Sequence, residues 1–404
     1  MQPTDIFSPE FEHDPYRYYE MMRNEHPLFF HEGLASYIVS RHEDVDKLLK
    51  SLAASTRAYA WQVEPVHGRT VLQMEGKEHA THRSLVTPLL RGRQLAEKVL
   101  PMVHRNAERI IGTIREEREV DFVEWFSERY PLDVLTDIFD LPRSDHAVFY
   151  RWYRAITEFA TNVTKDPEIH ATGLRVRQEM GDYMFPMIRR RREAPGEDML
   201  SWLANAEIDG VRMSDEDIRA FFSILLTAGA ETTAKSLATM LKNLLVHPAQ
   251  LAAIRNDRSL TPAAIAETLR HTSPGQMLFR IMDQDFEVSG GTLPAEAQVL
   301  ILIGSANRDP RRFEAPERFD IFRKDLDVER AFLGSSSSMA FGTGRHFCLG
   351  SMLAKAEMQV ALEQLLDATS DIQIVGEVPT ERGKFMRSIA TLRLRLTPAA
   401  RPQA

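Results

Sequence analysis

The feature that most constrains this chain is a long stretch without proline. Residues 214–246 contain no proline, and the next one along the chain is Pro248. Ser214 can cap a helix at the start of this stretch, with Asp217 reaching back as in a capping box. A helix of about 32 residues would be roughly 48 Å long at ~1.5 Å per residue. We therefore expect one helix that crosses the whole domain.

Helical periodicity dominates the rest of the chain as well, and strands are few. The pattern predicts helices at residues 15–24, 43–49, 79–90, 94–117, 145–161, 172–192, 248–256, 262–271 and 351–368. Prolines inside three of these should kink or end them, namely Pro88, Pro101 and Pro186. Strands are expected as a hairpin at 28–30 and 37–39, at 286–288 and 299–303 around Gly290-Gly291, and at 392–396. The sequence predicts a mainly α fold with small β-sheets.

Composition favours one large domain and argues against several classes of protein. The 404 residues are 43% hydrophobic and show no shift between the two halves, so we expect a single domain over 1–404. A net charge of −8 argues against binding to nucleic acid or to anionic membranes. A single cysteine argues against a disulfide framework and fits a reducing cytoplasm.

No segment has the character of a signal peptide or a membrane span. The first residues of the chain lack both a basic region and an apolar region. The longest apolar stretch, at 220–230, is interrupted by Ser223 and Thr227, and a membrane span needs roughly 20 apolar residues. We therefore expect a cytoplasmic protein without a transmembrane anchor.

The only cysteine, Cys348, follows a glycine-rich turn. Gly342 and Gly344 precede it at a spacing of two, which lets the backbone turn tightly and direct its amides toward the sulfur. A helix-forming run starts at Ser351, so the thiol lies at a helix N-terminus, where an anion is favoured. A thiolate there can act as a nucleophile or as a metal ligand, although a lone cysteine is more often a small buried apolar residue.

The ten residues from Phe341 to Gly350 resemble the heme-binding loop of the cytochrome P450 family, the heme-thiolate monooxygenases. The shared pattern Phe-Gly-x-Gly-x-His-x-Cys-x-Gly fixes six of these positions. The resemblance implies that the Cys348 thiolate is the proximal ligand of the iron in heme b (iron protoporphyrin IX). It also implies further cofactor-binding residues in the loop, namely Phe341, Gly342, Arg345, His346 and Gly350.

The long helix has a glycine beside polar residues in its middle. Gly229 follows Ala228 in an apolar stretch, and glycine inside a helix costs about 1 kcal/mol relative to alanine. Taken alone, this pattern indicates a helix crossing with Glu231 in solvent. The segment is similar, however, to the dioxygen-binding segment of the same family, which implies that Ala228 and Gly229 border the cofactor. By that resemblance, Thr232 hydrogen-bonds the oxygen being activated and Glu231 relays protons from solvent.

Glu267 and Arg270 stand three residues apart on one helical face, which by itself indicates an ordinary surface ion pair. They also match the family's Glu-x-x-Arg motif, and Pro-Glu-Arg-Phe at 316–319 matches the arginine-containing segment that follows it. The resemblance implies a structural cluster of Glu267, Arg270 and Arg318 that supports the heme-binding loop.

Heme carries propionate groups, so its site needs cationic partners. His79 and Arg83 are four residues apart on one helical face and match the family's His-x-x-x-Arg pattern. By the same resemblance, Arg280 and His346 are further propionate partners. Each of these side chains, taken alone, would be an ordinary surface charge.

The resemblance also indicates where substrate binds, at segments 55–71, 159–164, 277–279 and 385–389 and on the central helix. The proposed lining is mostly apolar, which suits a lipophilic small molecule: Phe159, Asn162, Phe222, Leu226, Ala230, Met277, Leu278 and Met386. Each apolar residue is equally consistent with plain core. Polar side chains that could anchor one end of a substrate are Arg57, His67, Asn162 and Gln276.

We therefore expect a monomeric monooxygenase that uses dioxygen to oxidise, most simply to hydroxylate, a lipophilic small molecule. The chain shows no flavin or iron–sulfur domain and no fused reductase. Electrons from NAD(P)H should arrive through a separate ferredoxin and ferredoxin reductase. An acidic partner would dock near Cys348, against Arg345 and Lys355.

Other functions stay open at the level of sequence. The same heme-thiolate chemistry could serve oxidative coupling, desaturation or ring formation in secondary metabolism. A heme-based sensor is a further alternative, against which the Glu231-Thr232 pair argues. A cysteine hydrolase is supported only by the thiol.

One part of the chain departs from the family pattern. Residues 324–337 are longer than the usual connection to the cysteine loop and end in a run of serines. This segment is expected to be a surface insertion or an element that alters partner docking or assembly.

Overall fold

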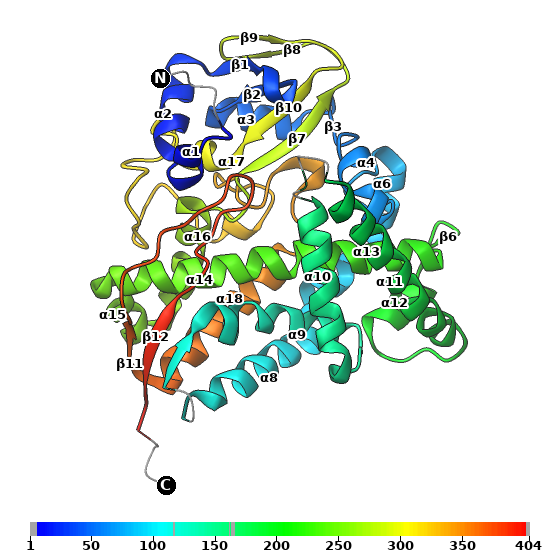
Figure 1. Cartoon of the computed structure of the whole chain (residues 1–404), viewed down its shortest axis with the longest axis vertical. Coiled ribbons are helices and arrows are strands. Elements are labelled where there is room, and N and C mark those ends of the chain that lie inside the picture. The colour runs from blue at the N-terminus through cyan, green and yellow to red at the C-terminus, as the bar shows by residue number, and fades with distance from the viewer. Residues whose placement is uncertain (1–5, 116–117, 161, 163–165, 401–404) are drawn as a thin grey trace. The chain divides into compact units, whose positions relative to one another are not determined.

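The computed structural model describes residues 6–115, 118–160, 162 and 166–400 (Figure 1). They cluster into two compact units, each made from separate stretches of chain. Unit 1 contains Met1–Ser55, His104–Tyr130 and Thr232–Ala404, and unit 2 contains Thr56–Val103 and Pro131–Glu231. Helices dominate and the sheets are small, so the predicted fold class is confirmed. A single domain over 1–404 stays a prediction.

The largest sheet belongs to unit 1 and has five strands in the order β1-β2-β10-β7-β3. β1 (Leu28–His31) and β2 (Ser36–Val39) form the predicted hairpin. β10 (Gln298–Leu302) runs parallel to β2 and antiparallel to β7 (Met277–Met282), which in turn pairs with β3 (Ala54–Ser55). The fully buried Val39, Val299 and Ile301 join this sheet to a core cluster that includes residues of α3 (His42–Lys50).

The predicted strand at 286–288 has an unexpected partner, and one strand was missed. β8 (Phe286–Val288) pairs across the glycine turn with β9 (Gly291–Leu293), and not with the strand at 298–302. β7 was missed because its burial is nearly continuous and gives no alternation of apolar and polar residues. The final predicted strand is β12 (Arg393–Pro398), which lies between β11 (Thr369–Ile374) and β4 (Glu119–Asp121).

The remaining helices of unit 1 include those that surround the cysteine loop and its supports. They are α1 (Pro9–His13), α2 (Tyr16–Glu25), α15 (Pro248–Asn256), α16 (Thr261–His271), α17 (Ile303–Ala306) and α18 (Ser351–Ala368). α18 begins and ends at the residues expected from the sequence. α16 and α18 pack against each other within the unit.

Unit 2 is a helical assembly with one small hairpin, β5 (Glu207–Ile208) and β6 (Val211–Arg212). Its longer helices are α6 (Gly76–Leu90), α10 (His146–Ala160), α11 (Pro167–Glu193) and α13 (Asp215–Ala228), and its shorter ones are α4 (Tyr59–Gln62), α5 (Glu64–His67), α7 (Gly92–Gln94) and α12 (Met199–Asn205). α11 packs against α10, α12 and α13, as Figure 1 shows.

Three of the described helices contain residues of both units: α8 (Leu100–Ile111), α9 (Arg129–Ile138) and α14 (Ala230–Val246). The single helix expected at 94–117 is instead α7, a π-helical turn at Leu95–Val99, α8 and a 3-10 turn at Gly112–Arg115, and residues 116–117 lie outside the described residues. Pro88 and Pro186 lie inside α6 and α11 without ending them. Within the described ranges, no helix is long and apolar enough to cross a membrane.

Candidate functional site

The loop of Cys348 has the tight backbone turns that its glycines predict. Gly342 and Gly344 have φ angles of +66° and +73°, a region that residues with side chains rarely adopt. The Cys348 N–H donates to the Phe341 carbonyl oxygen over 2.9 Å, which closes the loop on itself. The thiol residue is half-buried, and α18 begins three residues later at Ser351. The fold thus presents one partly accessible sulfur beside a helix N-terminus.

Residues 49–54 of unit 1 contact this loop. A Cβ atom at Gly344 would lie 2.4 Å from the Leu49 carbonyl oxygen, so only glycine fits there. The Arg345 guanidinium donates to the Ser51 carbonyl oxygen over 2.7 Å and to the Ala54 carbonyl oxygen over 3.1 Å. The Arg345 guanidinium therefore fastens the loop to residues 51–54, and a contact of Arg345 with an acidic partner stays a prediction.

The central helix is interrupted at one residue. α13 ends at Ala228 and α14 (Ala230–Val246) begins after Gly229, whose own φ and ψ of −81° and −46° remain helical. The expected capping box is present, with Ser214 and Asp217 bonded reciprocally. A Cβ at Gly229 would lie 2.7 Å from the Leu225 carbonyl oxygen. The glycine therefore permits a backbone arrangement that alanine would disturb.

Glu231 and Thr232 differ in their surroundings. Glu231 is 9% exposed, and its carboxylate accepts a hydrogen bond from the Thr157 hydroxyl of α10 over 3.4 Å. It is therefore not the solvent-exposed charge that an ordinary helix crossing would leave. Thr232 is partly exposed, and its carbonyl oxygen accepts from the Ser236 hydroxyl. An alcohol and an enclosed carboxylate thus follow each other in the chain, and both are groups that can exchange protons.

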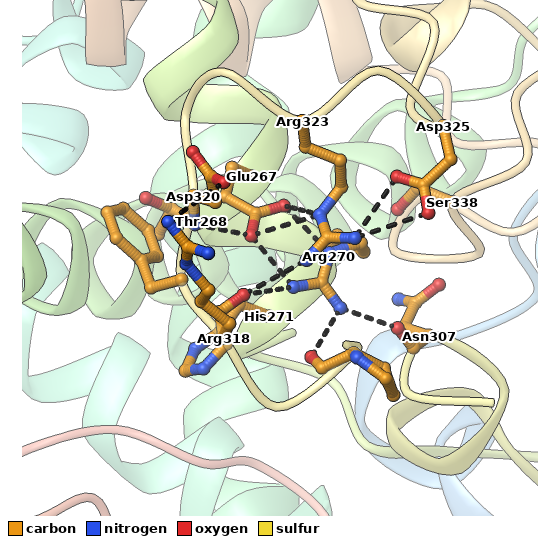
Figure 2. Close-up of polar contacts among 12 residues, drawn as sticks. Glu267, Thr268, Arg270, His271, Asn307, Arg318, Asp320, Arg323, Asp325 and Ser338 are labelled. Carbon is orange, nitrogen blue, oxygen red and sulfur yellow. Dashed lines mark hydrogen bonds and ion pairs between the residues drawn. The ribbon is translucent and has the colours of Figure 1, made fainter. Parts of the chain in front are cut away.

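The Glu-x-x-Arg pair forms a buried cluster in unit 1 (Figure 2). The Glu267 and Arg270 side chains are 1% and 0% exposed and form an ion pair of 2.7 Å on α16. The third member is Arg323, whose 6%-exposed side chain lies 3.2 Å from the Glu267 carboxylate. The expectation of Arg318 was wrong, because that side chain is 72% exposed and pairs with Asp320. Arg318 contributes only its carbonyl oxygen, which Arg270 binds over 3.2 Å.

A fully buried asparagine connects this cluster to the chain that leads into the cysteine loop. Arg270 donates to the Asn307 carbonyl oxygen over 2.9 Å, and Asn307 Oδ1 accepts the Met339 N–H over 2.7 Å. The Met339 carbonyl oxygen in turn accepts the Gly342 N–H. The predicted support of the loop by Glu267 and Arg270 therefore has a continuous path of hydrogen bonds. The sequence analysis did not single out Asn307 as a candidate, so its role was missed.

The cationic side chains proposed to bind propionates lie on two elements: Arg280 on β7 in unit 1, and His79 and Arg83 on α6 in unit 2. Arg280 on β7 is 5% exposed and donates to the Phe279 carbonyl oxygen over 2.7 Å. Within the described part of the chain, no acidic side chain forms an ion pair with it. His79 and Arg83 lie one turn apart on α6, with His79 buried. A buried guanidinium held only by a neutral carbonyl suits a carboxylate ligand such as a propionate.

Several positions proposed to line a substrate pocket are committed elsewhere. Phe222 is fully buried among aromatic rings, 5.0 Å from the Phe139 ring centre and 6.4 Å from that of Phe149, and is therefore core. The Asn162 side chain donates to the Asp166 carbonyl oxygen and accepts the Asp166 N–H, so it is bonded to the residue that caps the start of α11. Residues 161, 163 and 164 of the same proposed segment lie outside the described residues.

The remaining proposed lining residues are mostly buried. Phe159 packs against α11, where a Cβ at Gly173 would lie 2.7 Å from its ring. Leu226 and Ala230 are 0% and 3% exposed on the central helix. In unit 1 the two other segments meet, since the Phe279 ring centre lies 6.0 Å from that of Phe385, and Met386 pairs with Gly275 just before the first segment. Met277 is buried and Leu278 partly exposed on β7.

Two polar candidates for substrate anchoring serve the fold. Gln276 is fully buried, accepts from the Tyr19 hydroxyl and donates to the Ser273 carbonyl oxygen. His67 is buried with Nδ1 2.9 Å from the Ser223 hydroxyl, and burial lowers the pKa of His67 to about 3. Gln276 and His67 are both hydrogen-bonded to other residues of the protein. Neither side chain is therefore placed to anchor the polar end of a substrate.

One buried acid close to the proposed catalytic threonine was missed in the sequence. Glu357 on α18 is 3% exposed, and its carboxyl hydrogen-bonds the side chain of Thr233. Burial raises the pKa of the Glu357 carboxyl well above its ordinary value, because an apolar surrounding disfavours the charged form. This buried acid connects α14 to the helix that follows Cys348. In the sequence it reads as an ordinary helical glutamate.

Known proteins similar to this chain agree on one family. A family model described as Cytochrome P450 matches residues 9–370. Pulcherriminic acid synthase of Bacillus subtilis (strain 168) is 35% identical over 390 residues, covering 96% of each chain. Cyclomarin C epoxidase CymV of Salinispora arenicola is 30% identical over 373 residues, covering 91% of each. The solved structure of cytochrome P450 CYP109Q5 from Chondromyces apiculatus matches with a TM-score of 0.86 and 31% identity over 98% of both chains.

Proposed function

Since this chain belongs to the cytochrome P450 family, we propose that it is a heme-thiolate monooxygenase that oxidises a lipophilic small molecule. The family consists of oxidoreductases that bind heme iron through a thiolate and use dioxygen. Two relatives, named pulcherriminic acid synthase and cyclomarin C epoxidase, belong to a group of homologues in secondary metabolism. We extend that setting to this chain, and with it the expectation of a small secondary metabolite as substrate.

The observation that carries the proposal is the geometry of the Cys348 loop. Cys348 is the only cysteine in the sequence, and it lies after two glycines in left-handed conformations and before a helix N-terminus. A helix N-terminus favours a thiolate over a thiol, since the helix dipole stabilises the anion. The residues present therefore fit a heme, with Cys348 as its ligand and Arg280 as a propionate partner. His79, Arg83 and His346 are proposed as further propionate partners from the resemblance.

A bound heme with a thiolate ligand supplies the activation of dioxygen. The protein's part is to deliver protons and hold the substrate. We assign the Thr232 hydroxyl as hydrogen-bond donor on the distal side and the Glu231 carboxyl as the group that replaces the proton Thr232 gives up. The Thr157 hydroxyl, 3.4 Å from the Glu231 carboxylate, orients that acid. Gly229 keeps the backbone clear beside this pair, because a larger residue would press on the Leu225 carbonyl oxygen.

Electrons are proposed to come from NAD(P)H through a ferredoxin reductase and a ferredoxin, as is general for bacterial members of the family. Of the two basic residues expected to meet this partner, Arg345 is occupied by backbone carbonyls. The other is Lys355, which lies on the first turns of α18, with its ammonium 4.9 Å from the Phe332 ring centre. We therefore assign the docking charge near Cys348 to Lys355.

The test is the spectrum of the reduced carbon monoxide complex. Wild-type protein purified with heme should show the red-shifted Soret band that a thiolate ligand produces. Cys348→Ser should lose that band while keeping the far-ultraviolet circular dichroism of a folded helical protein. Wild-type protein that folds but does not bind heme would contradict the proposal.

Oxygen insertion and the coupling or desaturation alternative differ in their products. A library of lipophilic metabolites would first be titrated for shifts in the heme absorption spectrum, and the hits turned over under labelled dioxygen. One labelled oxygen atom in the product supports insertion. A product without label, formed at a comparable rate, would replace insertion by coupling, desaturation or ring formation.

A further inference from the structure

The segment 324–337, whose extra length had no explanation in the sequence, is anchored in the interior of unit 1. Leu326, Ala331 and Phe332 are 4%, 5% and 1% exposed. Its first residues are tied down by Asp325, whose carboxylate binds Arg323 at 3.1 Å (Figure 2). A surface insertion would keep its apolar side chains few or exposed. This segment instead buries three of its apolar side chains and leaves Leu333 45% exposed.

Phe332 is the residue through which the segment reaches the loop of Cys348. Its ring centre lies 6.1 Å from that of Phe341, and the Phe341 ring centre lies 6.3 Å from that of Phe347. Phe341 is also the residue whose carbonyl oxygen accepts the Cys348 N–H. Aromatic pairs at such distances favour particular orientations. The position of Phe332 therefore limits how Phe341 can move, and Phe341 in turn holds the backbone of the cysteine.

Two hydroxyl groups of the loop region bind the backbone of the same segment. The buried Ser351 hydroxyl donates to the Phe332 carbonyl oxygen over 3.0 Å, and the Thr343 hydroxyl donates to the Gly334 carbonyl oxygen over 3.2 Å. Gly334 also lies against the Phe347 ring, since a Cβ there would be 3.4 Å from the ring. Contacts thus come from residues on both sides of Cys348 in the chain.

The far end of the segment is held as well. His42 Nε2 lies 2.7 Å from the Ser337 carbonyl oxygen. Met339, two residues later, donates its N–H to Asn307. The segment is therefore fixed at its start, middle and end, with Phe332 and Gly334 as its points of contact with the loop.

We infer that residues 324–337 form a brace for the Cys348 loop and that Phe332 is its positioning residue. The brace rests on the proposed function in one respect, namely that Cys348 is the ligand whose placement matters. Lys355 packs its ammonium over the Phe332 ring at 4.9 Å, so the same aromatic side chain also lies beneath the charge assigned to partner docking.

The test uses Cys348 as a probe, since a single cysteine gives a single alkylation site. Purified full-length protein is treated with iodoacetamide under native conditions, and the adduct is followed by mass spectrometry. Phe332→Leu should raise the alkylation rate about tenfold, because loss of the aromatic contact lets the loop open more often. The same variant should lose part of the thiolate-type carbon monoxide band.

A matched control is available in the same region. Phe322 is 53% exposed, so Phe322→Leu makes the same chemical change without touching the loop and should leave both readouts at wild-type values. If Phe332→Leu does not fold, Thr343→Val removes one hydroxyl contact with little change in shape and should raise the alkylation rate severalfold. Thr343→Ser, which keeps the hydroxyl, should restore the wild-type rate.

The outcomes separate the brace from the proposed function. Alkylation of Phe332→Leu and Thr343→Val at the wild-type rate would overturn the brace even if the heme spectrum is normal. A wild-type protein without the thiolate band would overturn the ligand assignment. Faster alkylation in the variants of such a protein would still support the brace.

Discussion

The proposed role of the Cys348 loop depends on backbone geometry, whereas the proposed role of the substrate segments depends on the direction of side chains. The loop is shaped by the left-handed glycines at 342 and 344 and by the hydrogen bond of the Cys348 amide. In the substrate segments, function depends on where side chains point, and Phe222 and Asn162 point into contacts of their own. A tight backbone turn requires glycines at fixed spacings, and these can be recognised in a sequence. The direction of a side chain depends on residues far away in the chain, so it cannot be recognised from the local sequence.

The largest effect is expected where a side-chain role was assigned to the wrong residue. Arg323→Ala leaves the buried Glu267 carboxylate with one partner fewer and should lower the free energy of unfolding by about 4 kcal/mol. Arg318→Ala removes an exposed charge and should change it by less than about 0.5 kcal/mol. Urea unfolding of both variants measures the difference. Equal losses would restore Arg318 to the cluster.

The next effect probes the backbone side of the comparison. Gly344→Ala places a Cβ 2.4 Å from the Leu49 carbonyl oxygen in a left-handed conformation and should cost about 3 kcal/mol, with loss of bound heme. Gly342→Ala has the same conformational strain but no atom within 4 Å of the new Cβ, so about 1 kcal/mol is expected. Unfolding by urea and the heme-to-protein absorbance ratio check both. The same loss in both variants would mean that the contact with Leu49 contributes nothing.

The last effect concerns Glu357 and appears as a dependence on pH. Because burial raises the pKa of this carboxyl above its ordinary 4.5, the folded state keeps a proton that the unfolded state releases. Stability is therefore lost as pH rises above about 4.5, by at most about 1.4 kcal/mol per pH unit. Glu357→Gln removes this loss, so it should gain stability relative to wild type between pH 5 and 8. Melting temperatures across that range test this, and a difference that does not change with pH would mean that Glu357 is ionised in the folded protein.

Much of the fold and the core of the site could be predicted from the sequence. The start and end of α18, the capping box at Ser214 and the hairpin of β1 and β2 follow from local patterns. The glycine loop around Cys348 is likewise local. These features depend on residues within a few positions of one another, and the chain displays them directly.

The missed features depend on contacts across long separations. Arg323 reaches Glu267 across 56 positions and Gln276 reaches Tyr19 across 257, and neither pair has a mark in its own local sequence. The raised pKa of Glu357 comes from burial, which the sequence around a helical glutamate does not show. The interior contacts of Phe332 were equally hidden, because a serine-rich segment reads as exposed loop.

The strand order of the five-stranded sheet has a consequence for how the protein is made. β1, β2 and β3 lie in the first 55 residues, but β10 and β7, which stand between β2 and β3, come from residues 277–302. A chain emerging from the ribosome therefore carries its first strands unpaired on one edge until more than two hundred further residues have been translated. Residues 49–54, which contact Gly344 and Arg345, belong to this part of the chain that is translated early. Assembly of the cysteine loop is thus tied to the last third of synthesis, and chaperones that cover early strand edges are expected to matter for the yield of protein able to take up heme.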